Sequence, residues 1–214
     1  PTPHSAAITL CAPPPRGRRT VTQRPRAHNL SAARDVGPHC DTMLLLRPAT
    51  AHDLPDLRAI ERSATALYYE AGFSPDAIRP RDDDDMRDLL RQTTVLLARI
   101  DDEPIGYVSY YPRGPYLHLE EIAVRRDRQR RGCGALLAGQ VLAAAEADPQ
   151  CTHLSLVAFS RAAWAVGLYH RLGFVRLGAR PGHLPHSELL RELLPDDAPG
   201  EPRQIMVRPA PVPP

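Results

Sequence analysis

The sequence predicts a mixed α/β domain of the α+β type, built on a mostly antiparallel sheet. Three strand-like segments follow one another at 94–100, 105–111 and 116–124, and the first two are joined by a short polar turn at 101–104. Consecutive strands with short connections form an antiparallel meander. Helical patterns precede and follow these strands, so helices are expected to cover the sheet.

The other elements follow from hydrophobic periodicity and capping residues. Apolar residues recur at helical spacing in 54–71, after N-cap candidates at 50–53, and the acidic run 82–85 suits the start of a second helix. That run lacks the glycine and terminal glutamate of a calcium loop, so no metal is expected. The complete prediction is a set of strands at 43–50, 94–100, 105–111, 116–124, 154–159 and 203–208, with helices at 54–71, 83–92, 134–147 and 187–194.

The composition indicates a modest folded domain. Of the 214 residues, 43% are hydrophobic, which suffices for a core, and no apolar run approaches the roughly 18 residues that span a bilayer. The four cysteines lack the spacing of a metal site or a disulfide framework, so reduced thiols and a cytoplasmic location are expected. All 27 basic residues are arginine, a bias typical of a GC-rich bacterial genome.

Residues 1–42 differ from the rest of the chain in composition. They carry six arginines and two aspartates, are rich in proline and have few large hydrophobic residues. We therefore expect a disordered extension, followed by a folded domain at 43–210 and a tail at 211–214. Three alternatives remain: a transit peptide, which the prolines disfavour; a nucleic-acid-binding tail, which lacks interleaved aromatics; and a natural start at Met43.

A glycine-rich turn at 129–134 follows one strand and leads directly into a helix. The first turn of a helix has amides without internal partners and the positive end of the macrodipole, so it favours a bound anion. Gly132 and Gly134 lack the Cβ atoms that would keep a phosphate away, and Arg130 and Arg131 add positive charge. A phosphate-binding loop is expected here; the plain alternative is a strand-to-helix turn with solvated arginines.

The spacing of this turn distinguishes between known phosphate loops. A Walker loop needs Gly-Lys followed by Ser or Thr, and a dinucleotide fingerprint needs a glycine where Leu137 stands. The pattern Gln/Arg-x-x-Gly-x-Gly/Ala instead resembles the acetyl-CoA pyrophosphate loop of the GCN5-related N-acetyltransferase (GNAT) superfamily. A second segment, at 164–174, resembles the Leu-Tyr-x-x-x-Gly-Phe stretch of the same superfamily. The resemblance covers about 44–208.

This resemblance implies a central sheet of six to seven strands, mostly antiparallel, with helices on both faces. It also implies that acetyl-CoA binds along the end of the strand at 116–124 and in the glycine turn. One departure is that Ala162 stands where many members have an asparagine that contacts the cofactor arm, so Arg161 is a candidate for that role. The expected cofactor-binding residues are Ile122, Ala123, Val124, Gln129, Arg130, Arg131, Gly132, Cys133, Gly134, Ala135, Arg161 and Ala162.

Acyl transfer to an amine requires a proton acceptor, a polarised carbonyl and a proton donor for the leaving thiolate. Glu120 and Glu121 resemble the acidic positions used by the superfamily; side chains alternate in a strand, so only one should reach the acceptor unless a bulge intervenes. Whether Glu120, Glu121 or a water chain is the base stays open. Tyr169 is the candidate proton donor, and the Val124 amide is the expected polariser.

Tyr68 and Tyr69 end the first helix, which walls the acceptor site in the superfamily, so they are candidate substrate contacts; half-buried packing is an equal alternative. The leading hypothesis is an N-acetyltransferase that moves an acetyl group from acetyl-CoA to a small-molecule primary amine by direct attack in a ternary complex. A protein N-terminal or lysine acetyltransferase and a non-catalytic acyl-CoA sensor are the alternatives. A monomer or homodimer without membrane or metal partners is expected.

Overall fold

The computed structural model describes residues 44–178, 184, 187–194 and 201–210, which contain a seven-stranded sheet in the order β1-β2-β3-β4-β5-β7-β6. Neighbouring strands are antiparallel except β4 and β5, which are parallel. The predicted mostly antiparallel α+β sheet is therefore confirmed. The strands are β1 (Leu44–Pro48), β2 (Thr94–Ile100), β3 (Glu103–Arg113), β4 (Tyr116–Val124), β5 (His153–Phe159), β6 (Val175–Arg176) and β7 (Arg203–Pro209).

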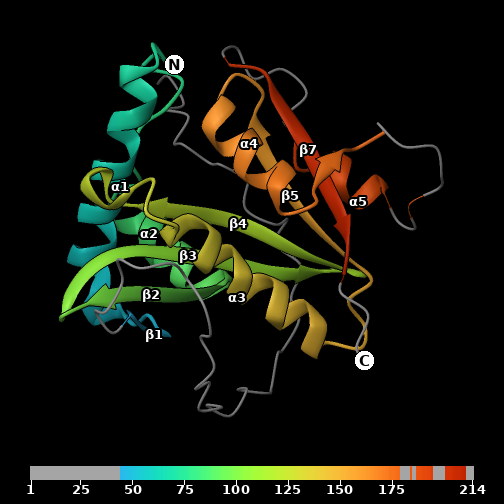
Figure 1. Ribbon diagram of the computed structural model, residues 1–214, viewed down its shortest axis with the longest axis horizontal. Coiled ribbons are helices and arrows are strands. Elements are labelled where there is room, and N and C mark those ends of the chain that lie inside the picture. Colours follow the sequence, from blue (N-terminus) through green and yellow to red (C-terminus); the bar gives the residue numbers. More distant parts are fainter. Residues whose placement is uncertain (1–43, 179–183, 185–186, 195–200, 211–214) are drawn as a thin grey trace.

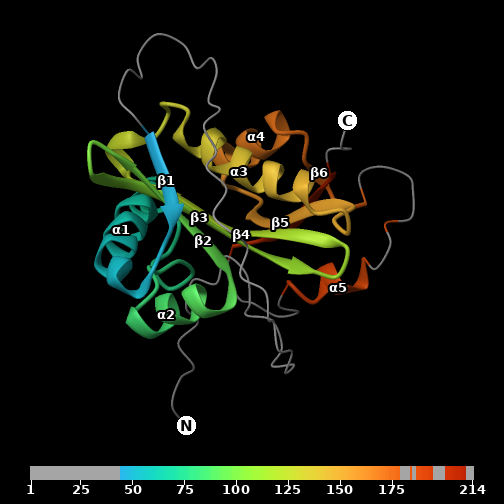
Figure 2. The same ribbon diagram turned by 90° about the horizontal axis from the view of Figure 1, so that it is seen from below.

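Helices cover both faces of this sheet (Figures 1 and 2). On one face lie α1 (Leu54–Glu70) and α2 (Asp83–Gln92), and on the other lie α3 (Cys133–Ala147) and α4 (Ala163–Arg171). The short helix α5 (Glu188–Arg191) packs beside β7, and single 3-10 turns precede α1 and α3 at Ala51–Asp53 and Arg126–Arg128.

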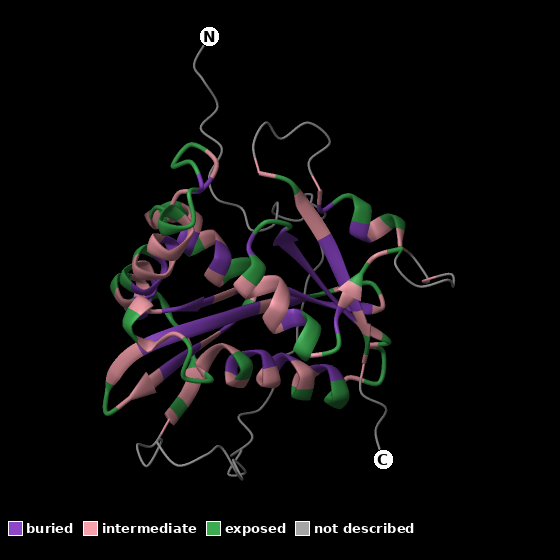
Figure 3. Ribbon diagram, turned by 45° about the horizontal axis from the view of Figure 1, so that its top comes forward, coloured by how far each residue is buried: buried purple, intermediate pink, exposed green. Residues whose placement is uncertain are grey.

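The sheet divides the apolar core into two main layers because side chains alternate along each strand. In β3, Tyr107 packs with Leu57 and Ile60 of α1, whereas Val108 packs with Leu137 of α3 on the opposite face. Figure 3 shows the result: the central strands are largely buried, while the helices have one buried side and one exposed side. The sheet thus holds α1 and α3 in fixed positions on either side of β4.

Capping and turn residues explain several boundaries that coincide with the prediction. The Asp82 carboxylate accepts hydrogen bonds from the amides of Asp84 and Asp85 at 3.0 and 2.9 Å, which starts α2 at the predicted residue. At the hairpin between β2 and β3, Asp101 and Asp102 have φ of 49° and 61°, the backbone of a two-residue hairpin turn with both central residues left-handed.

The N-terminal extension predicted at 1–42 and the tail at 211–214 lie outside the described residues. The domain predicted at 43–210 is described from Leu44, with gaps near its end, and the helix predicted at 187–194 is shorter, since only α5 is helical there. No helix among the described residues has both the length and the apolar character needed to cross a membrane.

The strands β4 and β5 lie side by side along only half of β4. Their pairing runs from Tyr116–His153 to Leu119–Leu156 and stops there. Beyond that point β5 stays paired with β7 up to Phe159, and β4 stays paired with β3 up to Val124, so the two strands diverge (Figure 1). The carboxyl half of β4 therefore has no neighbour in β5.

Candidate functional site

The start of α3 lies directly after the diverging half of β4. The turn uses two left-handed residues, Arg130 with φ of 62° and Gly132 with φ of 86°, and Gly132 is the N-cap with no side-chain capping bond. The first helical hydrogen bond runs from the Leu136 amide to the Gly132 carbonyl at 3.0 Å. The backbone N–H groups of residues 133–135 therefore come before the first hydrogen bond of the helix. Residues 130–132, beside them, are exposed.

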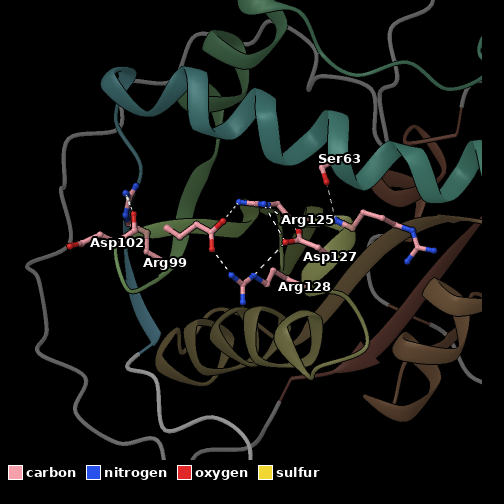
Figure 4. A network of polar contacts seen from close by, with 8 residues as sticks. Ser63, Arg99, Asp102, Arg125, Asp127 and Arg128 are labelled. Carbon is pink, nitrogen blue, oxygen red and sulfur yellow. Dashed lines mark hydrogen bonds and ion pairs between the residues drawn. The ribbon is translucent and has the colours of Figure 1, made fainter.

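The residues before this turn are fastened to two neighbouring elements (Figure 4). Arg125 and Arg128 both form ion pairs with Glu103 in the β2–β3 hairpin, and Arg125 also pairs with Asp127 at 3.2 Å. On the other side the Arg126 amide donates to the Ser63 hydroxyl of α1 at 3.0 Å. These contacts fix the segment before the turn.

The turn is also tied back to the end of β4. The side-chain Nε2 of Gln129 donates to the Val124 carbonyl at 2.9 Å. Because the backbone N–H of Arg125 donates to the Ile105 carbonyl in β3, strand alternation directs the backbone N–H and C=O of Val124 away from β3, toward the gap left by β5. Gln129 occupies the carbonyl, so an extended ligand could pair with the Val124 N–H.

A β-bulge in β4 decides where the two glutamates point. Ser109 of β3 pairs with Glu121 and the next residue, Tyr110, pairs with Leu119, so Glu120 is the extra residue. The bulge overrides the expected alternation and brings both carboxylates to one arginine. Glu120 Oε1 lies 3.5 Å from Arg81 Nη2, and Glu121 Oε2 lies 3.1 Å from Arg81 Nη1.

Arg81 is the centre of a buried polar cluster that also includes α1 and β3. Both its backbone amide and its Nη1 donate to Glu61 Oε1 of α1, at 3.0 and 3.1 Å. The Tyr107 hydroxyl of β3 donates to Glu61 Oε2 at 2.9 Å. The side chains of Arg81, Glu61, Glu120 and Glu121 are each 8% exposed or less, so this cluster lies almost entirely outside bulk solvent.

Burial and charge shift the proton affinities of this cluster. Burial raises the pKa of Glu121 to about 7; Arg81 opposes that rise, and Glu61 adds to it. Burial works against the charge of Arg81, but the surrounding carboxylates outweigh it and raise the Arg81 pKa well above its usual range. Near neutral pH, Glu121 can therefore take up and release a proton while Arg81 stays charged.

A small cavity of about 30 Å³ lies beside Glu121 and separates α1 from β4 and β5. Its volume exceeds the roughly 10–15 Å³ that one water molecule needs. Its lining includes two carboxylates and several apolar or aromatic groups. Its lining residues are Glu61, Ala64, Thr65, Tyr68, Ile78, Glu121, Ile122, Ala123 and Phe159.

Tyr169 and Tyr68 approach the same region from α4 and α1. Burial, and then the charge of Glu121, raise the pKa of Tyr169 above its ordinary value, and the same two causes together with Tyr169 raise that of Tyr68. Both phenols are therefore protonated at neutral pH. Because the charge of Glu121 contributes to both shifts, the two phenols lie within electrostatic range of that carboxylate.

The sequence matches the model of a known protein family. A model of the Acetyltransferase (GNAT) family matches residues 57–174, which is more than half of the chain. The chain belongs to the GNAT acetyltransferase family. The matched residues include the bulge, the glycine turn and Tyr169.

Solved structures of GNAT proteins have the same fold. The ribosomal-protein-S18-alanine N-acetyltransferase from Escherichia coli is 21% identical, with a TM-score of 0.59 over 78% of this chain and 94% of that chain. The PaiA N-acetyltransferase from Thermoplasma acidophilum, solved in complex with coenzyme A, is 12% identical, with a TM-score of 0.59 over 78% and 99% of the two chains. A putative phosphinothricin N-acetyltransferase is 19% identical, with a TM-score of 0.58 over 78% and 99%. No curated protein sequence matches the chain.

Three of the residues proposed from the GNAT resemblance make contacts away from the glycine turn. Arg161 pairs with Glu201 at 2.8 Å, donates to the Ala71 and Gly72 carbonyls at 3.1 and 3.2 Å and lies over the Phe73 ring. Its guanidinium thus fastens the end of α1. Ala162 is fully buried and offers only a methyl group there. Tyr69 is turned outward, and its hydroxyl donates to the Ile78 carbonyl at 2.9 Å.

Tyr68, in contrast, faces inward and packs edge-on against Phe73, Phe159 and Trp164. Cys133, the first residue of α3, is partly buried and packs against the main core. Another residue, His118, is fully buried: its Nδ1 lies 2.9 Å from the Ser155 hydroxyl, and burial lowers its pKa to about 3, so it is neutral.

Sequence reasoning missed Arg81, Glu61 and Tyr107. One signal was available: Glu61 falls on the apolar face of α1, between Ile60 and Ala64, and a charge on a buried helix face needs a partner. Nothing in the sequence identified Arg81 among the 27 arginines as that partner.

Proposed function

We propose that this GNAT protein transfers the acetyl group of acetyl-CoA to the primary amine of a small molecule, by direct attack in a ternary complex. One observation carries the proposal: the glycine turn at the start of α3 follows the half of β4 that diverges from β5, and the buried Glu121 lies in that same half. Phosphate binding and proton transfer are the two functions that such an enzyme must place on either side of the reacting thioester.

The glycine turn fits the diphosphate of acetyl-CoA. A Cβ atom on Gly132 would meet no other atom within 4 Å, so the N-cap is open to a ligand, and the helix amides there favour an anion. Arg130 and Arg131 supply positive charge from exposed positions. When bound, acetyl-CoA supplies an activated acyl group on a good leaving thiolate; the backbone of Val124 is oriented to hydrogen-bond along it.

The chain's own residues can manage the protons of the reaction. An amine arrives protonated and must lose a proton before it attacks. We assign Glu121 as the acceptor, through a water molecule in the cavity beside it, because its pKa of about 7 suits that role near neutral pH. Tyr169 keeps its proton and can give it to the departing sulfur. The Val124 N–H is the candidate polariser of the carbonyl.

The burial of Glu121 supports a small acceptor. Its side chain is 6% exposed, and the cavity of about 30 Å³ beside it is lined by Tyr68, Phe159 and Ile78 among others. A primary amine on an unbranched carbon can approach such a buried carboxylate, with one water molecule between them, at a lower steric cost than a bulky or branched centre. A cytoplasmic location and a monomeric or dimeric state remain part of the proposal.

The proposal is tested by Tyr169→Phe, which removes only the hydroxyl. We expect turnover to fall at least about tenfold, since a lost proton donor costs about 10²- to 10⁴-fold where it is fully used. Acetyl-CoA affinity should stay within about twofold, because the glycine turn is unchanged. Turnover is measured by free thiol release across an amine panel, and affinity by calorimetry.

Tyr116→Phe is the matched control for this substitution. Tyr116 is also buried but lies at the opposite end of β4 from Val124, in the cluster beneath α5. It should leave both turnover and affinity unchanged. Equal activity of the Tyr169→Phe and Tyr116→Phe proteins would refute Tyr169 as the proton donor, and a wild-type protein that acetylates no amine would refute the proposed function.

A further inference from the structure

Arg81 is a buried arginine at the centre of the carboxylate cluster, and it takes no part in the proton transfers proposed above. It lies at the end of the loop between α1 and α2, next to the N-cap Asp82, yet its side chain is only 5% exposed. Its guanidinium contacts Glu61 of α1 and both glutamates of the β4 bulge, at 3.1 to 3.5 Å. One arginine thus joins the loop, the helix and the strand at the proposed proton acceptor.

The charges in this cluster do not balance. Three carboxylates surround one guanidinium, so the group would carry a net negative charge if every member were ionised. Burying this excess of about two negative charges is costly, and each proton taken up by a carboxylate reduces it by one. The titratable and charged groups that face Glu121, taken from every element packed around it, are Glu61, Tyr68, Arg81, Tyr107, Glu120 and Tyr169.

We propose that Arg81 is a positioning residue, which holds the two glutamates on one face of β4 and keeps the Glu121 carboxylate available as the proton acceptor. The inference rests on the proposed function for its effect on catalysis. Without the guanidinium, Glu120 and Glu121 would repel each other and Glu61, and the bulge would lose the contact that orients both side chains. Arg81 itself transfers no proton, because it stays charged.

The loop that carries Arg81 is held in place at several points. The Tyr69 hydroxyl donates to the Ile78 carbonyl, and Arg161 donates to the carbonyls of Ala71 and Gly72 at the start of the loop. At its end, the Arg81 amide donates to Glu61. The position of Arg81 is therefore set by the same loop that closes the acceptor side of the cavity.

Two substitutions test this role with opposite signs. An opposite charge within about 4–6 Å lowers a carboxyl pKa by about 1–3, and a like charge raises it. Arg81→Gln should therefore move the rising limb of the pH–kcat/KM profile upward by about one pH unit or more. Glu61→Gln should move the same limb downward, because it removes a neighbouring negative charge. Arg81→Lys keeps the charge and should return the limb most of the way toward the wild-type position.

Arg79→Gln is the matched control. Arg79 is in the same loop, but its side chain is about a third exposed and pairs with Asp85 at 3.8 Å on the surface. It should leave the profile where it is. A purely structural role for Arg81 predicts a different result, in which Arg81→Gln lowers the amount of active protein at every pH without moving the limb.

A readout that needs no turnover separates this inference from the proposed function. The side-chain carboxyl of Glu121 is titrated by carbon NMR in the wild type, Arg81→Gln and Glu61→Gln, and is assigned by comparison with Glu121→Gln. Opposite displacements of the Glu121 titration midpoint support the role of Arg81 even if no amine is found. Coincident midpoints in all three proteins overturn it. If Arg81→Gln does not fold, Arg81→Met, which removes the same charge and keeps a long side chain in the buried site, takes its place in the titration.

Discussion

The glycine turn proposed to bind the diphosphate is one contiguous segment, 129–135, whereas the carboxylate cluster draws its members from α1, the loop after it, β3 and the bulge in β4. The first uses backbone amides and exposed arginines. The second uses side chains buried behind Tyr68 and Phe159. A local motif can bind a cofactor wherever a strand meets a helix, but a proton acceptor with a shifted pKa needs the tertiary fold around it.

The two regions should also respond differently to solvent conditions. Exposed charges such as Arg131 are screened by salt, with a Debye length of about 8 Å at physiological ionic strength. Buried charges such as Arg81 are screened much less. Substitutions in the turn should therefore change acetyl-CoA affinity in a salt-dependent way, and substitutions in the cluster should change turnover and its pH dependence.

The largest effect is expected for Glu121→Gln, which removes the proposed proton acceptor and keeps the shape of the side chain. We expect turnover to fall about 10²- to 10⁴-fold. In the wild type, kcat/KM should rise with pH through about 7, as the carboxyl loses its proton. The variant should lose this limb, while its acetyl-CoA affinity, measured by calorimetry, stays unchanged.

Glu121→Gln should also change how the stability of the fold depends on pH. The folded pKa of Glu121, about 7, is above the value of an unfolded chain, so between about pH 4.5 and 7 the folded state binds the extra proton. Wild-type stability should therefore fall as pH rises through this window, and the Glu121→Gln protein should show a flatter dependence in urea unfolding. An unchanged activity profile in the variant would assign the proton acceptor to Glu120 or to water alone.

A smaller effect is expected from Gly132→Ala in the turn. Gly132 has a φ of 86°, and a side chain in the left-handed region costs about 1–2 kcal/mol. If that cost distorts the amides that face the diphosphate, acetyl-CoA binding should weaken about tenfold while the pH limb stays in place.

Gly139→Ala provides the comparison within the same helix. Gly139 lies inside α3, and a Cβ there would meet nothing within 4 Å. The change should leave acetyl-CoA affinity alone and stabilise the fold by about 0.5–1 kcal/mol, because alanine favours helix more than glycine does. Equal loss of affinity in both variants would mean that the left-handed turn is not what binds the cofactor.

Most of the fold could be predicted because its signals are local. Three elements coincide with their predicted bounds: the strands at 94–100 and 116–124 and the helix at 83–92. The polar turn after the first strand and the N-cap Asp82 before the helix are local signals of this kind. Two helix bounds shifted by a single residue: α3 begins at Cys133 rather than Gly134, because Gly132 is its N-cap, and α1 ends at Glu70 because Ala71 is its C-cap. The glycine turn was found for the same reason: all its residues are adjacent in sequence.

The acceptor side was predicted only in part because its geometry depends on contacts between distant residues. Glu120 and Glu121 were proposed from the sequence, but alternation predicted opposite faces unless a bulge intervened, and only the pairing of Ser109 and Tyr110 with β4 reveals that bulge. Arg81 is 40 residues from Glu121 in sequence. Arg161 has the right chemistry for a phosphate, yet the fold engages it at the end of α1 and with Glu201. Strand register and contacts between distant segments determine what these side chains contact.

The smallest effect is expected for Arg131→Gln, which separates the two regions by their response to salt. Arg131 is exposed beside the turn, and exposed ion pairs contribute about 0.2–1 kcal/mol. The KM for acetyl-CoA should rise about 1.4- to 5-fold at low ionic strength and return to the wild-type value at about 0.5 M salt. Arg91→Gln removes the same charge from α2, where the arginine pairs with Asp88, and should leave KM unchanged. A salt-insensitive rise for Arg131→Gln would mean that the arginine contacts the ligand in a dry, specific site, which would make the turn resemble the buried cluster more than the exposed surface.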